Sequence, residues 1–145
     1  MIEQEHHHRA LIAMYQSAPF QQLFSESEMT IEQGRSEIKS VINENTFHAG
    51  GSAHGFSYFR FLDDAAYFAA ASLENEYFIV TKEFKVQFKR PLFAGEIIAR
   101  GMAIVLGNHI FAKSTLYQND KILAEGEGEF SKSKVPLSKV NAYQH

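Results

Sequence analysis

The stretch AHGFSYFRFLDDAAYFAAASL, residues 53–73, decides the fold of this 145-residue chain. Almost all of its residues are aromatic or alanine, which predicts one long buried helix. Two adjacent carboxylates, Asp63 and Asp64, stand in the middle of it. Burial of a carboxylate is costly unless the group is paired or hydrogen-bonded. The two acids therefore need an explanation that the apolar pattern does not give.

The composition indicates a single globular domain over residues 1–145. Hydrophobic residues make up 45% of the chain, and the 13 Phe without any Trp predict a core built on phenylalanine. The net charge of -3 argues against a nucleic-acid partner. No apolar run is long enough to span a membrane, so we expect no membrane partner.

Cysteine is absent, which excludes disulfides, thiol catalysis and zinc–thiolate sites together. This fits a reducing cytoplasm, and the acidic start MIEQEHHH does not resemble a signal peptide. The consecutive residues His6, His7 and His8 would point in different directions on a helix, so we expect no metal site there. No phosphate-cradling loop and no G-x-S-x-G elbow occurs. The sequence predicts no metal and no cofactor.

Before the central helix, helical spacing of apolar residues predicts an N-terminal helical segment within residues 1–25, interrupted at Pro19. Residues 29–42 suggest one strand with a kink at Gly34. After the helix, residues 78–89 alternate, with Phe84, Val86 and Phe88 on one face. Further strands are expected near 96–106 and 109–118, followed by a turn at residues 119–120.

The last strand, ILAEGEGEFSK, places five small or apolar residues on one face: Ile122, Ala124, Gly126, Gly128 and Phe130. The two glycines would let a helix lie very close to the sheet. The element order predicts an α+β fold in which a curved antiparallel sheet wraps around the central helix, with a core over residues 28–135. Because the sheet leaves its edges and one face uncovered, we expect an oligomer.

The two acids differ in their helical neighbours. Asp64 has Arg60 one turn before it, so we predict an ordinary i,i+4 ion pair. Asp63 has only aromatic residues and alanines at helical spacing. A carboxylate that caps a distant backbone donor would be one explanation, and a functional group is the other.

The segment that precedes the helix favours the functional explanation. Gly50, Gly51 and His54 lead into Gly55 at the expected helix start. The first N–H groups of a helix have no internal partner and carry partial positive charge, so they favour an anion or a developing oxyanion. Asp63 lies about 12 Å further along the axis, at roughly 1.5 Å per residue, too far for one reaction centre within a protomer. A two-fold dimer would bring Asp63 of one chain beside Gly55 of the other.

The stretch HAGGSAHGF, residues 48–56, together with FLDDAA and the turn RPLFAGEIIARG, resembles the hotdog-fold acyl-CoA thioesterases, in particular their PaaI-like branch. That branch has a loop of the form N-x-x-G-x-x-H-G-G and an acid nine residues after the histidine. Gly51, His54, Gly55 and Asp63 occupy those positions here. The resemblance covers about residues 43–131.

The resemblance implies the hotdog fold and metal-free hydrolysis of an acyl-CoA thioester in a homodimer or tetramer with shared active sites. Gly55 would supply the oxyanion donor, and the partner's Asp63 would act as nucleophile or general base. His54 would help to position the thioester. Thr81 stands where the family has a helper hydroxyl, although the strand alternation places it on the opposite face from Phe84 unless a bulge intervenes.

Two positions depart from the family pattern, because His48 replaces the loop asparagine and Phe56 replaces the second glycine. His48 could still donate a hydrogen bond, and Phe56 would narrow the acyl pocket beside Phe59. Three cations, Arg90, Lys132 and Lys134, are candidates for the phosphates of coenzyme A, although a solvated strand end is the favoured explanation for them.

Two functions other than hydrolysis stay open at this point. A non-catalytic hotdog protein could bind an acyl-CoA or a free acyl group with the same residues. Hydration or dehydration of an acyl thioester is less favoured, since no paired Asp and His share one loop. The aromatic content suits an aromatic or a medium-chain acyl group, and core packing explains that content equally well.

Overall fold

The computed structural model describes residues 2–24 and 26–143. A 3₁₀ turn η1 (Pro19–Leu23) follows the first helix α1 (Ile2–Ser17), and the second helix α2 spans Gly55–Ala71. The strands are β1 (Glu28–Glu32), β2 (Arg35–Ile42), β3 (Tyr77–Phe88), β4 (Gly95–Leu106), β5 (His109–Gln118) and β6 (Lys121–Pro136), with short 3₁₀ turns η2 (Glu44–Thr46) and η3 (Leu137–Lys139).

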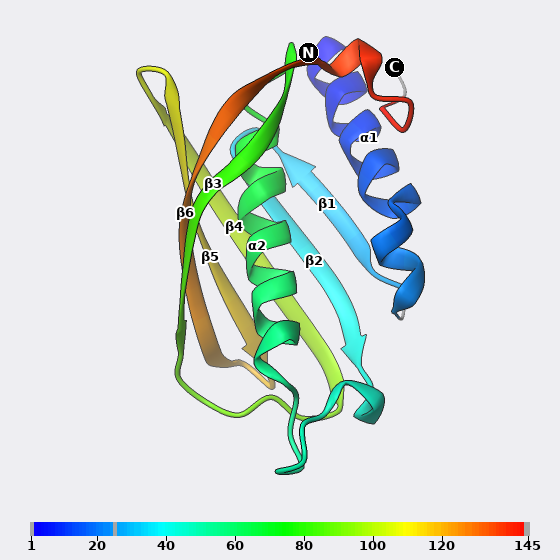
Figure 1. Ribbon diagram of the computed structural model, residues 1–145, viewed down its shortest axis with the longest axis vertical. Coiled ribbons are helices and arrows are strands. Elements are labelled where there is room, and N and C mark those ends of the chain that lie inside the picture. Colours follow the sequence, from blue (N-terminus) through cyan, green and yellow to red (C-terminus); the bar gives the residue numbers. More distant parts are fainter. Residues whose placement is uncertain (1, 25, 144–145) are drawn as a thin grey trace.

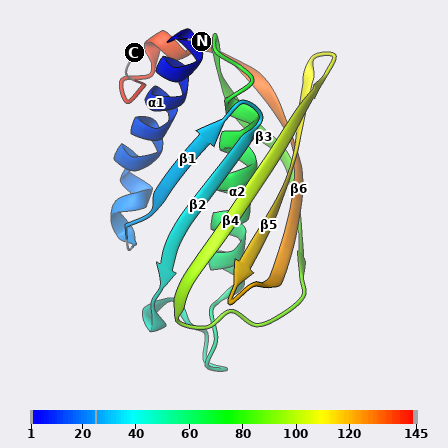
Figure 2. The ribbon, with the colours of Figure 1, turned by 180° about the vertical axis from the view of Figure 1, so that it is seen from behind.

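The strands form one antiparallel sheet in the order β1-β2-β4-β5-β6-β3. Figure 1 shows this sheet curving around α2, with α1 beside the β1 edge, and Figure 2 shows the same sheet from its outer face. The predicted α+β architecture, with an extra N-terminal helix and one long central helix, is confirmed.

The region 29–42 corrects one sequence prediction, since it is a hairpin rather than a kinked strand. Glu32 pairs with Arg35 across a turn at Gln33 and Gly34. Gly34 has a φ of +77°, a backbone conformation that L side chains rarely adopt. The glycine therefore reverses the chain instead of bending it. The predicted turn at Asn119 and Asp120 is present, with positive φ at both residues.

The close approach between sheet and helix occurs on β4, not on β6 as predicted. A Cβ built on Gly101 would collide with the main-chain carbonyl of Ala65 in α2. Gly126 and Gly128 instead lie beneath the Phe84 ring of β3, since a Cβ at either would come within 2.6 Å of that ring. The Phe84 ring of β3, rather than the helix, therefore covers this part of the inner face of β6.

The first residues of β6 also differ from the prediction. Ile122 is 37% exposed, whereas Leu123 is only 3% exposed. The register with β5 shifts between Leu116 and Tyr117, where β6 contributes one residue more than β5. Such a bulge reverses the faces of the strand on one side of it. From Ala124 onward the predicted inner face holds, because Ala124 and Phe130 are fully buried.

Candidate active site

The side chains of α2 form two neighbouring stripes on the side of the helix that the sheet leaves open. Gly55, Phe59 and Asp63 follow each other at four-residue spacing and face β3, and we call them the β3-facing stripe. Phe56, Arg60 and Asp64 make the η1-facing stripe, directed at the 3₁₀ turn and at Phe24. The two adjacent acids, Asp63 and Asp64, thus belong to different stripes.

The start of α2 leaves one backbone donor unused. His54 is the N-cap residue, and its Nδ1 accepts a hydrogen bond from the Phe56 N–H at 3.0 Å. Its carbonyl accepts from the Ser57 N–H at 2.9 Å. Within the part of the chain that the structure describes, the Gly55 N–H has no acceptor. A Cβ on Gly55 would meet only the Phe88 ring, at 3.6 Å, so the approach to this donor is open.

The loop before the helix is held by His48. Its Nδ1 accepts from the Gly50 N–H at 2.9 Å, and its Nε2 lies 3.0 Å from the Ser52 hydroxyl. The Gly51 N–H donates to the His48 carbonyl, and Gly51 has a φ of +90°. Because both ring nitrogens are engaged within the loop, His48 fixes the loop conformation.

Asp63 lies on the β3-facing stripe with a single hydrogen bond, from the Thr81 hydroxyl at 3.4 Å. Burial raises the pKa of Asp63, and the Thr81 hydroxyl lowers it in part. A register shift in β3 between Thr81 and Glu83 turns Thr81 toward the helix, against the alternation set by Phe84. The bulge therefore gives the carboxylate its one polar partner.

The direct ion pair predicted between Asp64 and Arg60 is wrong. Gln21 of η1 stands between them: its Nε2 donates to Asp64 Oδ2 at 3.2 Å, and its Oε1 accepts from Arg60 Nη2 at 2.7 Å. Burial raises the pKa of Asp64 to about 6, despite the Gln21 hydrogen bond and the Arg60 charge. No sequence pattern points to Gln21, because it is 43 residues away from Asp64 along the chain.

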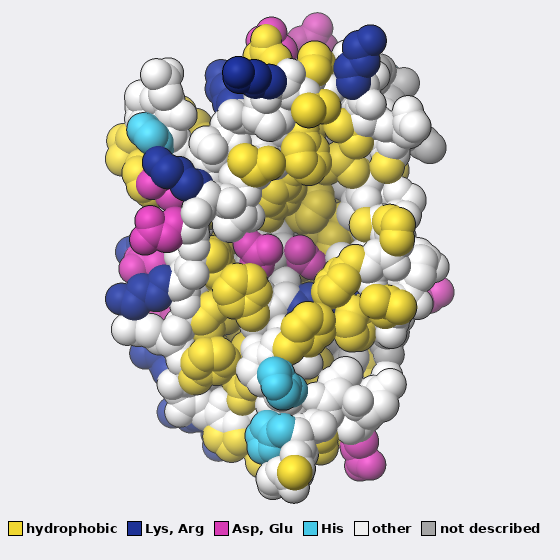
Figure 3. Space-filling model, in the orientation of Figure 1, with side chains coloured by type: hydrophobic (Ala, Val, Ile, Leu, Met, Phe, Trp, Pro, Cys, Tyr) yellow, Lys and Arg dark blue, Asp and Glu magenta, His cyan; other side chains and the backbone are white. Residues whose placement is uncertain are grey.

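Aromatic rings line the two stripes, and the sequence analysis assigned no role to two of them, Phe20 and Phe24. Phe59 packs edge-on against Phe84 at 5.3 Å between ring centroids, whereas Phe56 packs against Phe20 and Phe24. Figure 3 shows acidic side chains in the middle of this face, with hydrophobic side chains around them. Three rings of the face stay substantially exposed, with Phe56 at 45%, Phe59 at 43% and Phe88 at 57%. An apolar ligand or a second protein surface would cover them.

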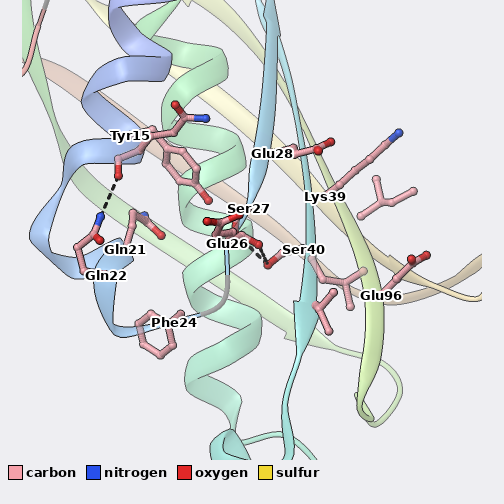
Figure 4. A pocket seen from close by; sticks show the side chains of 14 residues that line it. Tyr15, Gln21, Gln22, Phe24, Glu26, Ser27, Glu28, Lys39, Ser40 and Glu96 are labelled. Carbon is pink, nitrogen blue, oxygen red and sulfur yellow. Dashed lines mark hydrogen bonds between the residues drawn. The ribbon is translucent and has the colours of Figure 1, made fainter.

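A further cavity lies away from the β3-facing stripe. It has a volume of about 940 Å³ and opens between η1, the start of β1 and the edge of β2. In Figure 4 its side chains come from α1 (Tyr15), η1 (Gln21), β1 (Glu28) and β2 (Ser40). None of the site residues predicted from the sequence lines it.

The three candidate cations do not gather at one place. Arg90 lies near the start of α2, where its carbonyl accepts a hydrogen bond from the Tyr58 hydroxyl at 2.9 Å. Arg90 donates from Nη1 to the Ile122 carbonyl at 2.6 Å and so ties the β3–β4 connection to β6. Lys132 pairs with Glu74, just beyond the C-terminal end of α2, at 3.1 Å. Both Lys132 and Lys134 lie within β6, which continues to Pro136, rather than after the last strand as predicted.

Among the described residues, no three His, Asp or Glu side chains come together in a way that could hold a metal ion. No helix in that part of the chain is long and apolar enough to cross a membrane.

Comparison of the sequence with known families finds a match to the thioesterase superfamily over residues 50–112, which include α2, β3 and β4. No curated protein matches the sequence. The predicted resemblance to thioesterases is thereby confirmed for this part of the chain.

Solved structures confirm the hotdog fold. The Escherichia coli PaaI protein, from the phenylacetic acid degradation operon, matches with a TM-score of 0.81 and 18% identity, over 91% of this chain and 96% of that chain. A phenylacetic acid degradation-related protein from Ralstonia eutropha matches with a TM-score of 0.74 and 19% identity, over 86% and 98%. A Streptococcus mutans protein bound to acetyl-CoA matches with a TM-score of 0.68 and 17% identity, over 76% of this chain and 90% of that chain.

Proposed function

We propose that this protein hydrolyses an acyl-CoA thioester to free coenzyme A and a carboxylic acid. One observation carries the proposal: the unused Gly55 N–H at the start of α2 and the Asp63 carboxylate lie on one stripe of the helix. The match of residues 50–112 to a thioesterase superfamily agrees with it, as does the acetyl-CoA bound by the structurally similar Streptococcus mutans protein.

The chemistry follows from the two groups. The Gly55 N–H and the helix dipole would stabilise the negative charge that develops on the thioester oxygen. Asp63 would either attack the carbonyl carbon, giving a mixed anhydride that water then hydrolyses, or take a proton from the attacking water. Both routes break the C–S bond, form a C–O bond and deliver a proton to the coenzyme A thiolate.

A homodimer would complete the site. Gly55 and Asp63 are about 12 Å apart along one helix axis, so a single protomer cannot place both on one carbonyl. In a two-fold arrangement each site would take Gly55 from one chain and Asp63 from the other. β3 is the edge strand beside this stripe, and its outer side is unpaired in the described chain.

A thiol-release assay on short, medium and aromatic acyl-CoAs tests the proposal. We expect Asp63→Asn to lower kcat/KM by on the order of a hundredfold or more, as loss of a group that acts in the transition state does. Asp64→Asn is the matched control and should retain activity within about threefold. If the unmodified protein binds acyl-CoA but releases no thiol, the enzyme proposal fails and a non-catalytic acyl-CoA-binding protein is the better description.

A further inference from the structure

Arg60 is a buried cation with a free hydrogen-bonding edge. Its guanidinium lies between the rings of Phe24 and Phe61, at 4.3 and 4.4 Å from their centroids, and the residue is 8% exposed. Nη2 donates to Gln21, but Nε has no partner among the described residues. A buried donor without an acceptor is costly, so this N–H points to an acceptor that a ligand brings.

A small cavity adjoins this group. It has a volume of about 110 Å³, and Arg60, Phe24, Ser57 and Thr46 are among the residues that line it. Ser57 is itself a buried residue, at 3% exposed. At about 30 Å³ for each water-sized group, the cavity holds three or four such groups. Its size suits the end of a short chain, and Arg60 Nε is the buried donor without a partner among its lining residues.

The cavity lies next to the proposed reaction centre. Ser57 is two residues after Gly55 in the first turn of α2, and Phe24, which lines the cavity, also packs on Phe56 at 5.8 Å. Phe56, the residue after Gly55, therefore packs on a ring that lines the cavity, and this contact links the start of α2 to the cavity. The acyl chain of a substrate would run along the η1-facing stripe, away from Asp63.

The charges already present around Arg60 decide which kind of ligand group can accept a hydrogen bond from its Nε. Asp64, reached through Gln21, already balances the Arg60 guanidinium at neutral pH. A ligand carboxylate would add a second negative charge beside Asp64 without a further cation, and an uncompensated buried charge is strongly unfavourable. An uncharged oxygen, such as a hydroxyl or a keto group, would satisfy the free Nε–H and leave the site neutral.

We infer that the cavity beside Arg60 is a specificity subsite for an uncharged oxygen substituent on a short acyl chain, with Arg60 Nε as its donor. This inference rests on the proposed function for the identity of the substrate. Arg60 is a specificity-determining residue in this arrangement and takes no part in the chemical step.

The test measures binding, so that it does not depend on turnover. Four-carbon CoA thioesters are titrated into the Asp63→Asn protein by calorimetry: butyryl-CoA, 3-hydroxybutyryl-CoA, acetoacetyl-CoA and succinyl-CoA. We expect the hydroxy or the keto compound to bind at least about tenfold more tightly than butyryl-CoA, as a hydrogen bond to a charged group does. Succinyl-CoA should bind no more tightly than butyryl-CoA.

Adding Arg60→Lys keeps the positive charge but removes the Nε–H and the planar edge. It should abolish the preference while leaving butyryl-CoA binding within about threefold. Arg100→Lys, at an exposed residue paired with Glu37, is the matched control and should keep the preference. Equal binding of all four compounds, a preference that survives Arg60→Lys, preferred succinyl-CoA or no binding at all would each overturn the inference. Absence of thiol release by the unmodified protein, with an Arg60-dependent preference intact, would overturn hydrolysis alone.

Discussion

The two stripes of α2 place two adjacent aspartates in opposite circumstances. On the η1-facing stripe, Asp64 belongs to a chain of hydrogen bonds that runs through Gln21 to Arg60. On the β3-facing stripe, Asp63 has one long hydrogen bond from Thr81 and no cation within ion-pair distance in the described chain. Burial raises the pKa of both carboxyls. Hydrogen-bonding partners, rather than burial, therefore distinguish the structural acid Asp64 from the candidate catalytic acid Asp63.

Removal of the Gly55 N–H, at the start of the β3-facing stripe, is expected to have the largest effect on activity. Gly55→Pro removes the N–H at the first helical position, where proline is favoured, and His54 with φ −59° and ψ 146° suits a residue before proline. We expect kcat to fall by about 10²–10³-fold with little change in stability. Gly55→Ala keeps the N–H and is the control. Equal activity of the two variants in the thiol-release assay would exclude the oxyanion role.

Mixing that variant with Asp63→Asn tests whether a site is shared between chains. Homodimers of either variant should be inactive. A mixed dimer would contain one site that has both an intact Gly55 N–H and an intact Asp63. Random mixing would restore about a quarter of the unmodified activity, since half of the dimers are mixed and each has one working site. No recovery after verified subunit exchange would show that the site does not cross a two-fold interface.

The η1-facing stripe should dominate the pH dependence of stability. Since the pKa of Asp64 is raised to about 6, the folded state binds a proton more tightly than the unfolded chain. Its contribution to the free energy of unfolding is full below about pH 4 and lost as pH rises to about 6, by at most about 3 kcal/mol. Urea unfolding from pH 4 to 8 should show this decline, and Asp64→Asn should flatten it. Superimposable curves for the two proteins would contradict the assignment.

The smallest effect concerns Thr81. Its hydroxyl lowers the pKa of Asp63, so Thr81→Val should raise that pKa further. Asp63 must be ionised to act, and the acid limb of the kcat/KM profile should therefore move to higher pH. Thr81→Ser retains the hydroxyl and should keep the profile of the unmodified protein. A limb that moves equally in both variants would indicate a packing effect of the lost methyl group instead.

Local patterns were sufficient wherever one element determined the outcome. The apolar run of residues 53–73 predicted the buried helix, alternation predicted the later strands, and Gly55 followed by Asp63 predicted the candidate site. These features depend on neighbours within a turn or along a strand, and such periodicities are visible in a single sequence.

The tertiary structure decided what depends on contacts between distant segments. It placed Gln21 between Asp64 and Arg60, directed Thr81 to Asp63 through a bulge, and brought the helix closest to the sheet at Gly101. It also turned residues 29–42 into a hairpin. In each case two elements compete for one space or one hydrogen bond. Only packing of the whole chain resolves that competition, so the sequence alone determined the helix that bears both acids, and the fold determined their surroundings.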